Sequence, residues 1–139
     1  MTPQEIYQGY LWASAMTRNA DALAELFADD GVLESPLVPA GHDYPRRLEG
    51  REQIRAEMAA YYQRSANAAQ AAGTGQQPDT GKSRYVLHTT ADPGVFIVEI
   101  DAVLSGPAGS TTIPLVQIFR VRDDKITLLR DYFSPAIVS

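Results

Sequence analysis

Hydrophobic residues recur every three or four positions through much of the first half of the chain, which is the spacing of helices that bury one face. The opening Thr-Pro-Gln-Glu, residues 2–5, combines a capping threonine, an early proline and a capping-box glutamate, so it predicts a helix start. This helix should run to about residue 16. A second, shorter helix should begin at Asn19 and end at the Asp-Asp-Gly of residues 29–31, and a third should cover residues 51–65. The apolar stripes are Ile6, Tyr7, Tyr10 and Leu11 in the first helix, Leu23, Leu26 and Phe27 in the second, and Ile54, Met58, Tyr61 and Tyr62 in the third.

Alternation of apolar and polar residues replaces that spacing in the second half of the chain and predicts β-strands. One earlier strand is predicted at residues 31–38, where Ser35 points to the same side as two leucines. The Pro- and Gly-rich residues 39–50 should form a loop, and the Ala-, Gln- and Gly-rich residues 66–83 a mobile loop or a frayed helix end. Four strands should follow as an antiparallel meander, at about residues 83–91, 95–104, 111–122 and 125–133. Helices followed by a separate meander predict an α+β fold in a single domain over residues 1–139.

The last predicted strand carries a carboxylate between two hydrophobic neighbours. Residues two apart on a strand share a face, so Asp131 should point the same way as Leu129 and Phe133. Burial without a partner costs about 2–7 kcal/mol even for a neutral polar group, and more for a charge. Asp131 is therefore expected to be paired, exposed at a sheet edge, or retained for a function.

Composition excludes several classes of protein. The chain has 139 residues, of which 45% are hydrophobic, and its net charge of −5 argues against a nucleic-acid-binding surface. It has no cysteine, which excludes disulfides, thiolate metal sites and a cysteine nucleophile. No signal peptide and no apolar run of roughly 18 residues is visible, so a cytoplasmic protein without a membrane partner is expected. His42 and His88 have no second His or Cys at ligand spacing, so no metal is expected.

Four strings occur in order along the chain: LFADDGVLESP, RRLEGREQIRAEM, HTTADPGVFIVEID and FRVRDDKITLLRDYFSP. Together they resemble the SnoaL-like branch of the ketosteroid-isomerase-like, or nuclear-transport-factor-2-like, superfamily, over most of the chain outside residues 67–82. The resemblance implies three helices closing one side of a strongly curved sheet, which is a cystatin-like α+β cone with a deep apolar pocket, and often a homodimer. Members include polyketide cyclases, epoxide hydrolases, isomerases and non-catalytic binders, so the fold alone does not decide the function.

The resemblance does not extend to the catalytic groups of ketosteroid isomerases. Those enzymes use a carboxylate base and two oxyanion donors, a tyrosine and a protonated aspartate. The resemblance places the base at Ser35, beside Glu34, the aspartate at Pro114, and the tyrosine at about Leu11, beside Tyr10. All three positions depart from the pattern, so steroid-type isomerisation by that mechanism is not expected.

The resemblance to limonene epoxide hydrolase is better. It places the two catalytic aspartates of that enzyme at Asp101 and Asp131. The arginine that bridges them corresponds to Glu99, so the bridge is lost and three carboxylates could share one pocket. Repulsion and desolvation would raise their pKa values, which would keep one carboxyl protonated near pH 7 as a general acid and leave an ionised neighbour as a base.

Three functions follow as hypotheses. The first is a cofactor-independent acid/base enzyme acting on a hydrophobic small molecule, as in a polyketide-type cyclase, with Asp131 and Asp101 as the acid/base pair and Glu99 as their modulator. The second is an epoxide hydrolase that uses the same carboxylates. The third is a non-catalytic small-molecule binding module, whose carboxylates would point to water or to ion pairs. The residues expected to line the pocket are Trp12, Ser35, His88, Pro114 and Phe133, and Tyr44, in the loop after the first strand, is a candidate lid aromatic.

The strand pattern itself offers a competing interpretation of Glu99 and Asp101. Both lie on one face of their predicted strand, whereas the opposite face is apolar throughout. The apolar face is the natural core-facing one, which would send both carboxylates to solvent or to a dimer interface. His88, alone on its strand, is by the same logic a structural group.

Overall fold

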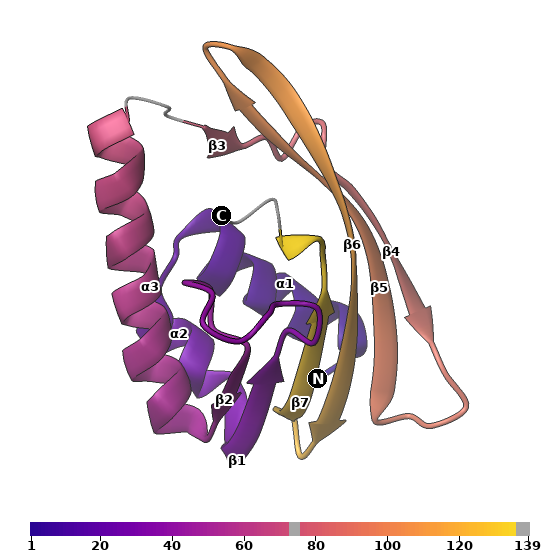
Figure 1. Cartoon of the computed structure of the whole chain (residues 1–139). Helices are drawn as coiled ribbons and strands as arrows, with labels where there is room; N and C mark the ends of the chain where they lie inside the picture. The colour runs from indigo at the N-terminus through magenta and orange to yellow at the C-terminus, as the bar shows by residue number, and fades with distance from the viewer. Residues whose placement is uncertain (73–75, 136–139) are drawn as a thin grey trace.

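The computed structural model describes residues 1–72 and 76–135, and its helices precede most of its strands, which confirms the predicted α+β order. Its elements are α1 (Pro3–Leu11), the π-helical turn η1 (Trp12–Met16), α2 (Ala20–Glu25), β1 (Phe27–Glu34), β2 (Arg47–Glu49), α3 (Arg51–Ala72), β3 (Gln77–Pro78), β4 (Arg84–Thr89), β5 (Val95–Gly106), β6 (Gly109–Arg122) and β7 (Lys125–Tyr132) (Figure 1). Among these described residues, no helix is long and apolar enough to cross a membrane.

The strands form one mixed sheet in the order β2-β1-β7-β6-β5-β3, with β4 also paired to β5. The strands β4 to β7 are the predicted antiparallel meander, and β1 joins its edge by pairing parallel to β7. The long strands β5 and β6 curl over the helices, and all three helices lie on one side of the sheet (Figure 1). The result is the half-barrel of the predicted cone, with an inner face under the helices.

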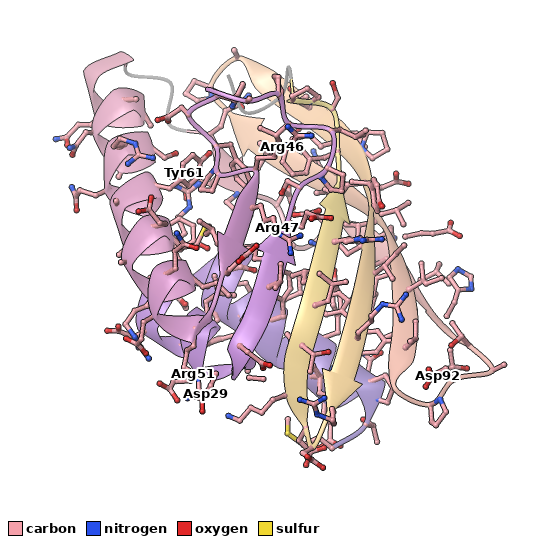
Figure 2. The ribbon with its side chains drawn as sticks, turned by 60° about the horizontal axis from the view of Figure 1, so that its bottom comes forward. Asp29, Arg46, Arg47, Arg51, Tyr61 and Asp92 are labelled. Atoms are coloured by element: carbon pink, nitrogen blue, oxygen red, sulfur yellow. The ribbon has the colours of Figure 1, made fainter. Side chains whose placement is uncertain are left out.

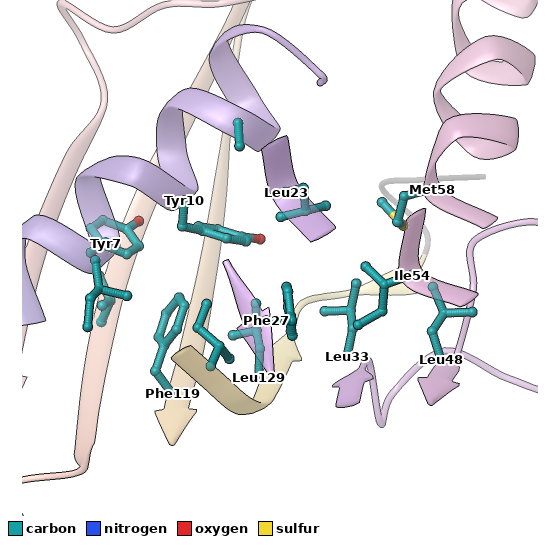
Figure 3. Packing of buried hydrophobic residues seen from close by; sticks show 14 of the residues in the cluster. Tyr7, Tyr10, Leu23, Phe27, Leu33, Leu48, Ile54, Met58, Phe119 and Leu129 are labelled. Atoms are coloured by element: carbon teal, nitrogen blue, oxygen red, sulfur yellow. The ribbon is translucent and has the colours of Figure 1, made fainter. Parts of the chain in front are cut away.

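The inner face of the sheet packs an aromatic cluster against α1. Strand register sets Phe96 beside Phe119, and their rings stack with centroids 4.7 Å apart. Tyr7 and Tyr10, from the predicted apolar stripe of α1, meet Phe119 edge-on at 5.8 and 5.4 Å (Figure 3). This cluster fixes α1 on the sheet and so determines where the Tyr10 hydroxyl lies.

The structure corrects the predicted second helix. That helix ends at Glu25, and Phe27 begins β1 with its side chain fully buried. The Asp-Asp-Gly of residues 29–31 is an irregularity within β1, where the register with β7 shifts, and not a helix end. Arg51, at the start of α3, pairs with Asp29 at 2.8 Å and also donates to the Phe27 carbonyl at 2.8 and 3.0 Å (Figure 2).

Two predicted loops contain structure. The segment 39–50 includes the short strand β2. Helix α3 continues to Ala72, past the predicted end at residue 65, which agrees with the helix-end alternative for the start of residues 66–83 and not with the loop. Within the predicted loop 66–83, residues 77–78 form β3, while residues 73–75 lie outside the described residues. Low sequence complexity hid the last two turns of α3, because alanine and glutamine give no apolar stripe, although both favour helices.

Gly31 should be intolerant of any side chain, because a Cβ there would lie 2.8 Å from the Ile126 carbonyl oxygen and 3.0 Å from that of Ala28. We expect Gly31→Ala to lower the free energy of unfolding by about 1–3 kcal/mol, as overpacking against rigid backbone does. The control is Gly81→Ala, whose Cβ would meet its nearest neighbour at an ordinary 3.5 Å. Urea unfolding of both variants would contradict the bulge geometry if the two were equally stable.

Candidate functional site

Asp131 lies on the inner face of the sheet, in β7, underneath the helices. Strand pairing sets it directly beside Gln117 of β6, which in turn pairs with Val98 of β5. Only 7% of Asp131 is exposed, and its Oδ1 atom has no hydrogen-bond partner among the described residues. Within residues 1–72 and 76–135 Asp131 also forms no ion pair, so neither an ion pair nor exposure at a sheet edge accounts for it there.

Burial changes the acidity of this carboxyl. Loss of solvent raises the pKa of Asp131 to about 7, and the neighbouring Gln117 amide opposes the shift. The Oε1 atom of Gln117 is also buried without a donor among the described residues. A protonated Asp131 carries the O–H that such a carbonyl oxygen lacks, so this pair of side chains is best satisfied when Asp131 is neutral.

Two tyrosines complete the buried polar group. The Gln117 side chain donates from Nε2 to the Tyr10 hydroxyl at 3.2 Å. Tyr44, from the loop before β2, meets the Phe133 ring edge-on at 5.1 Å. Burial, with the nearby Asp131 carboxyl, holds the pKa of both phenols well above its usual range. Both hydroxyls therefore stay neutral and can donate hydrogen bonds.

An aromatic cavity of about 220 Å³ opens on the helix side of this group. Tyr61 lies on the side of α3 that faces the sheet (Figure 2). Asp131 is not on the cavity wall and lies close to the two wall tyrosines Tyr10 and Tyr44. A larger, more open hollow of about 600 Å³ adjoins the cavity, because Arg18 and Tyr62 line both. The wall of the cavity includes Tyr10, Leu33, Tyr44, Met58, Tyr61 and Tyr62.

Contrary to the prediction, Glu99 and Asp101 do not share a pocket with Asp131. Both are exposed on the outer face of β5, as the strand pattern alone indicated. The Oε1 atom of Glu99 lies 3.0 Å from His88 Nε2, and more than half of the Glu99 side chain is in solvent. Asp101 lies in register with Arg84 and Pro114 on the same outer face. The apolar face of β5 packs against the core, so the carboxylates of Glu99 and Asp101 on the opposite face point to solvent.

The remaining predicted pocket residues divide into two groups. Ser35 and Phe133 are buried near Tyr44, and the Ser35 hydroxyl has no partner among the described residues. Trp12 is 51% exposed and lines only the outer hollow, while Pro114 is exposed on the far side of the sheet. His88 is likewise on the outer face.

Sequence analysis missed one of the residues that surround Asp131. Gln117 could have been found, because it is a polar residue on the same strand face as Ile113 and Phe119, which are buried. Tyr44, the candidate lid aromatic, lies on the wall of the cavity. No group of three His, Cys, Asp or Glu side chains that could hold a metal occurs among residues 1–72 and 76–135.

Comparison with known families finds one domain that spans most of the chain. Residues 8–129 match the SnoaL-like domain. A curated relative, an uncharacterised PhzA/B-like protein of Pseudomonas aeruginosa, is 31% identical over 127 residues, which cover 86% of this chain and 77% of the relative.

Solved structures of similar shape carry several different names. A protein of Bacillus subtilis provisionally named an isomerase has a TM-score of 0.67 at 18% identity, covering 97% of this chain and 88% of its own. A provisionally named polyketide cyclase of Pseudomonas putida has a TM-score of 0.59 at 16% identity, covering 95% and 91%. An epoxide hydrolase of M. tuberculosis, similar to limonene epoxide hydrolase, has a TM-score of 0.54 at 19% identity, covering 93% and 80%. At these identities the likeness shows the fold alone.

The raised pKa of Asp131 should make the free energy of unfolding depend on pH. With a pKa of about 7 in the folded protein, against about 3.9 in the unfolded chain, the folded state holds a proton that the unfolded state loses above pH 4. The free energy of unfolding should therefore fall as pH rises from 4 to 7, by up to about 4 kcal/mol from this group. Asp131→Asn cannot ionise and should be more stable than the parent protein at pH 8, but close to it at pH 4.5.

Urea unfolding at the two pH values measures this difference. The matched control is Asp101→Asn, the same substitution at an exposed carboxylate, which should show no such dependence on pH. A stability gap for Asp131→Asn that is equal at both pH values would show that Asp131 ionises normally.

Proposed function

The chain belongs to the SnoaL-like domain family, and we propose that it is a cofactor-independent acid/base enzyme that acts on a hydrophobic small molecule, as a cyclase of polyketide-type compounds. One observation carries this proposal: a buried carboxyl with a pKa of about 7, which has no ion-pair partner among the described residues, lies behind the tyrosines of an aromatic cavity.

A pKa near the working pH suits proton transfer. Both the acid and the carboxylate form are then populated, which is the optimum for a group that must accept and return a proton. A structural carboxyl would gain more from an ion pair, and ten such pairs occur elsewhere among the described residues, most of them at the surface. The cost of leaving Asp131 without one supports catalysis over simple binding.

Ring closure by carbon–carbon bond formation fits these groups. The Asp131 carboxylate removes a proton from the carbon next to a substrate carbonyl, and the Tyr10 hydroxyl donates a hydrogen bond to the enolate oxygen that forms. The enolate carbon then bonds to a second carbonyl carbon of the same molecule. The oxygen of that second carbonyl takes the proton back from Asp131, so no oxidant, water or cofactor is consumed.

Substrate reaches Asp131 past Tyr44 in this scheme. Tyr44 belongs to the segment between β1 and β2, and its ring lies near Asp131 on the cavity wall. The scheme requires the Tyr44 ring to move away from the wall so that the cavity extends to the carboxyl. The ring would then cover the reacting atoms when it returns.

The epoxide-hydrolase alternative is less well supported. That chemistry was assigned to two carboxylates, one to protonate the leaving oxygen and one to activate water. Among the described residues, Asp101 and Glu99 face outward, which leaves Asp131 without a carboxylate partner. The homodimer and the cytoplasmic location expected from the sequence stay predictions.

Loss of the Asp131 carboxyl should abolish turnover. We expect Asp131→Asn to lower kcat by roughly 10²- to 10⁴-fold, the contribution usual for a general acid/base. The assay offers a poly-β-keto substrate mimic and, separately, a hydroxy-epoxide, and identifies products by mass spectrometry and NMR. A new carbon ring supports the cyclase, whereas a diol supports epoxide hydrolysis. The control Asp101→Asn should keep full activity, and unchanged turnover by Asp131→Asn would refute the assignment.

The value of kcat/KM should also increase with pH. The carboxylate form of Asp131 must be present to remove the first proton, so kcat/KM should rise with pH through about 7 and then level off. A profile that is flat between pH 5.5 and 8.5 would contradict the role of Asp131 as the base.

A further inference from the structure

Arg18 occupies an unusual position at the entrance of the site. It lines the aromatic cavity, the outer hollow of about 600 Å³, and a third hollow of about 260 Å³ between η1 and β3. Its side chain is exposed, so the guanidinium group is available to a ligand entering by any of these routes.

The backbone at Arg18 is strained. Its φ of +49° lies in the left-handed region, where glycine is the usual residue. The conformation is imposed by the π-helical turn η1, after which the Arg18 N–H donates to the Ser14 carbonyl at 3.0 Å. Strained non-glycine residues and π-helical turns both concentrate at functional sites. The presence of an arginine in this backbone conformation therefore indicates that its side chain has a function.

Nearby carboxylates are already paired with other arginines. Asp21, which also lines the outer hollow, pairs with Arg55 at 3.0 Å, and Asp43 pairs with Arg64 at 3.0 Å. Within residues 1–72 and 76–135, no ion pair is formed by Arg18. The positive charge of Arg18 acts instead on the cavity, where it works against the burial that raises the pKa of Tyr61 and Tyr62.

We propose that the substrate is an amphipathic carboxylate, whose acidic group is bound by Arg18 while its apolar, reacting part enters the aromatic cavity. A guanidinium group matches a carboxylate with two parallel hydrogen bonds, which gives orientation as well as affinity. The cavity is smaller than the roughly 300–1,000 Å³ of pockets for drug-sized ligands, so the part that enters it is small. The statement that the apolar part of the substrate reacts rests on the proposed function, whereas the statement that Arg18 binds a carboxylate does not.

Binding of a matched pair of ligands tests this without any turnover. The probes are 4-phenylbutyrate and its uncharged amide, titrated into ¹⁵N-labelled protein and followed by NMR at pH 6, where Asp131 is mainly protonated. The parent protein should bind the acid about five- to tenfold more tightly than the amide, as expected for a partly exposed charged hydrogen bond. The shifted amide signals should include those of η1.

The informative variant is Arg18→Gly, because glycine tolerates the left-handed backbone and the protein should fold at least as stably as before. It should bind acid and amide equally, with its affinity for the amide unchanged. Arg18→Lys keeps the charge and should retain part of the preference. The control Arg64→Gln, at an arginine already paired with Asp43, should retain all of it.

Two results would overturn the proposal. One is an acid that binds the parent protein no better than the amide does, including the case in which neither binds at millimolar concentration. The other is a preference that survives in Arg18→Gly. Either result leaves the role of Asp131 in turnover untouched, and loss of turnover in Asp131→Asn leaves the binding preference untouched, so the two proposals can fail separately.

Discussion

Desolvation of one carboxyl is the constraint on which the interpretation of this protein depends. Asp131 faces inward because β7 is in register with β6, and a shift by one residue would exchange it for Tyr132. The register is held by the buried Phe119 and Leu129, which pair across the same two strands. The acidity of Asp131 is thus a consequence of core packing two residues away along the strand.

Most of the buried polar atoms without partners gather around Asp131. Among the described residues there are four such side-chain atoms, of which Asp131 Oδ1, Gln117 Oε1 and Ser35 Oγ belong to this group and the Tyr7 hydroxyl does not. Asp131 and Gln117 are cross-strand neighbours, and Ser35 and Asp131 both lie near Tyr44. Native proteins leave few buried polar groups unsatisfied, so three together support the proposal that this group belongs to a binding site. The cavity beside them gives a ligand a route of entry.

Strong periodicity made the fold predictable, and its absence marks the failures. The alternation of β4 to β7 predicted both the meander and the inward position of Asp131 from its neighbours Leu129 and Phe133. Glu99 and Asp101 were misplaced because a family resemblance was given more weight than the strand pattern, which had them facing outward. The bulge at residues 29–31 and the position of Tyr44 depend on contacts between distant segments, such as that of Arg51 with Asp29, which no local pattern encodes.

Separation of charge explains how one small site could hold an anion and still use a carboxyl as a base. A carboxylate bound beside Asp131 would repel the ionised form and raise its pKa further, beyond the range useful at neutral pH. Arg18 lines the cavity and the outer hollow, where an ion pair with the substrate carboxylate would offset its negative charge and so reduce the repulsion felt by Asp131. The pKa of Asp131 is then set mainly by burial, which the Gln117 amide opposes, with or without substrate. Arg18 at the entrance and Asp131 behind the aromatic wall therefore act together in the two proposals: Arg18 binds the charged end of the substrate, and Asp131 keeps a pKa at which it can act as a base.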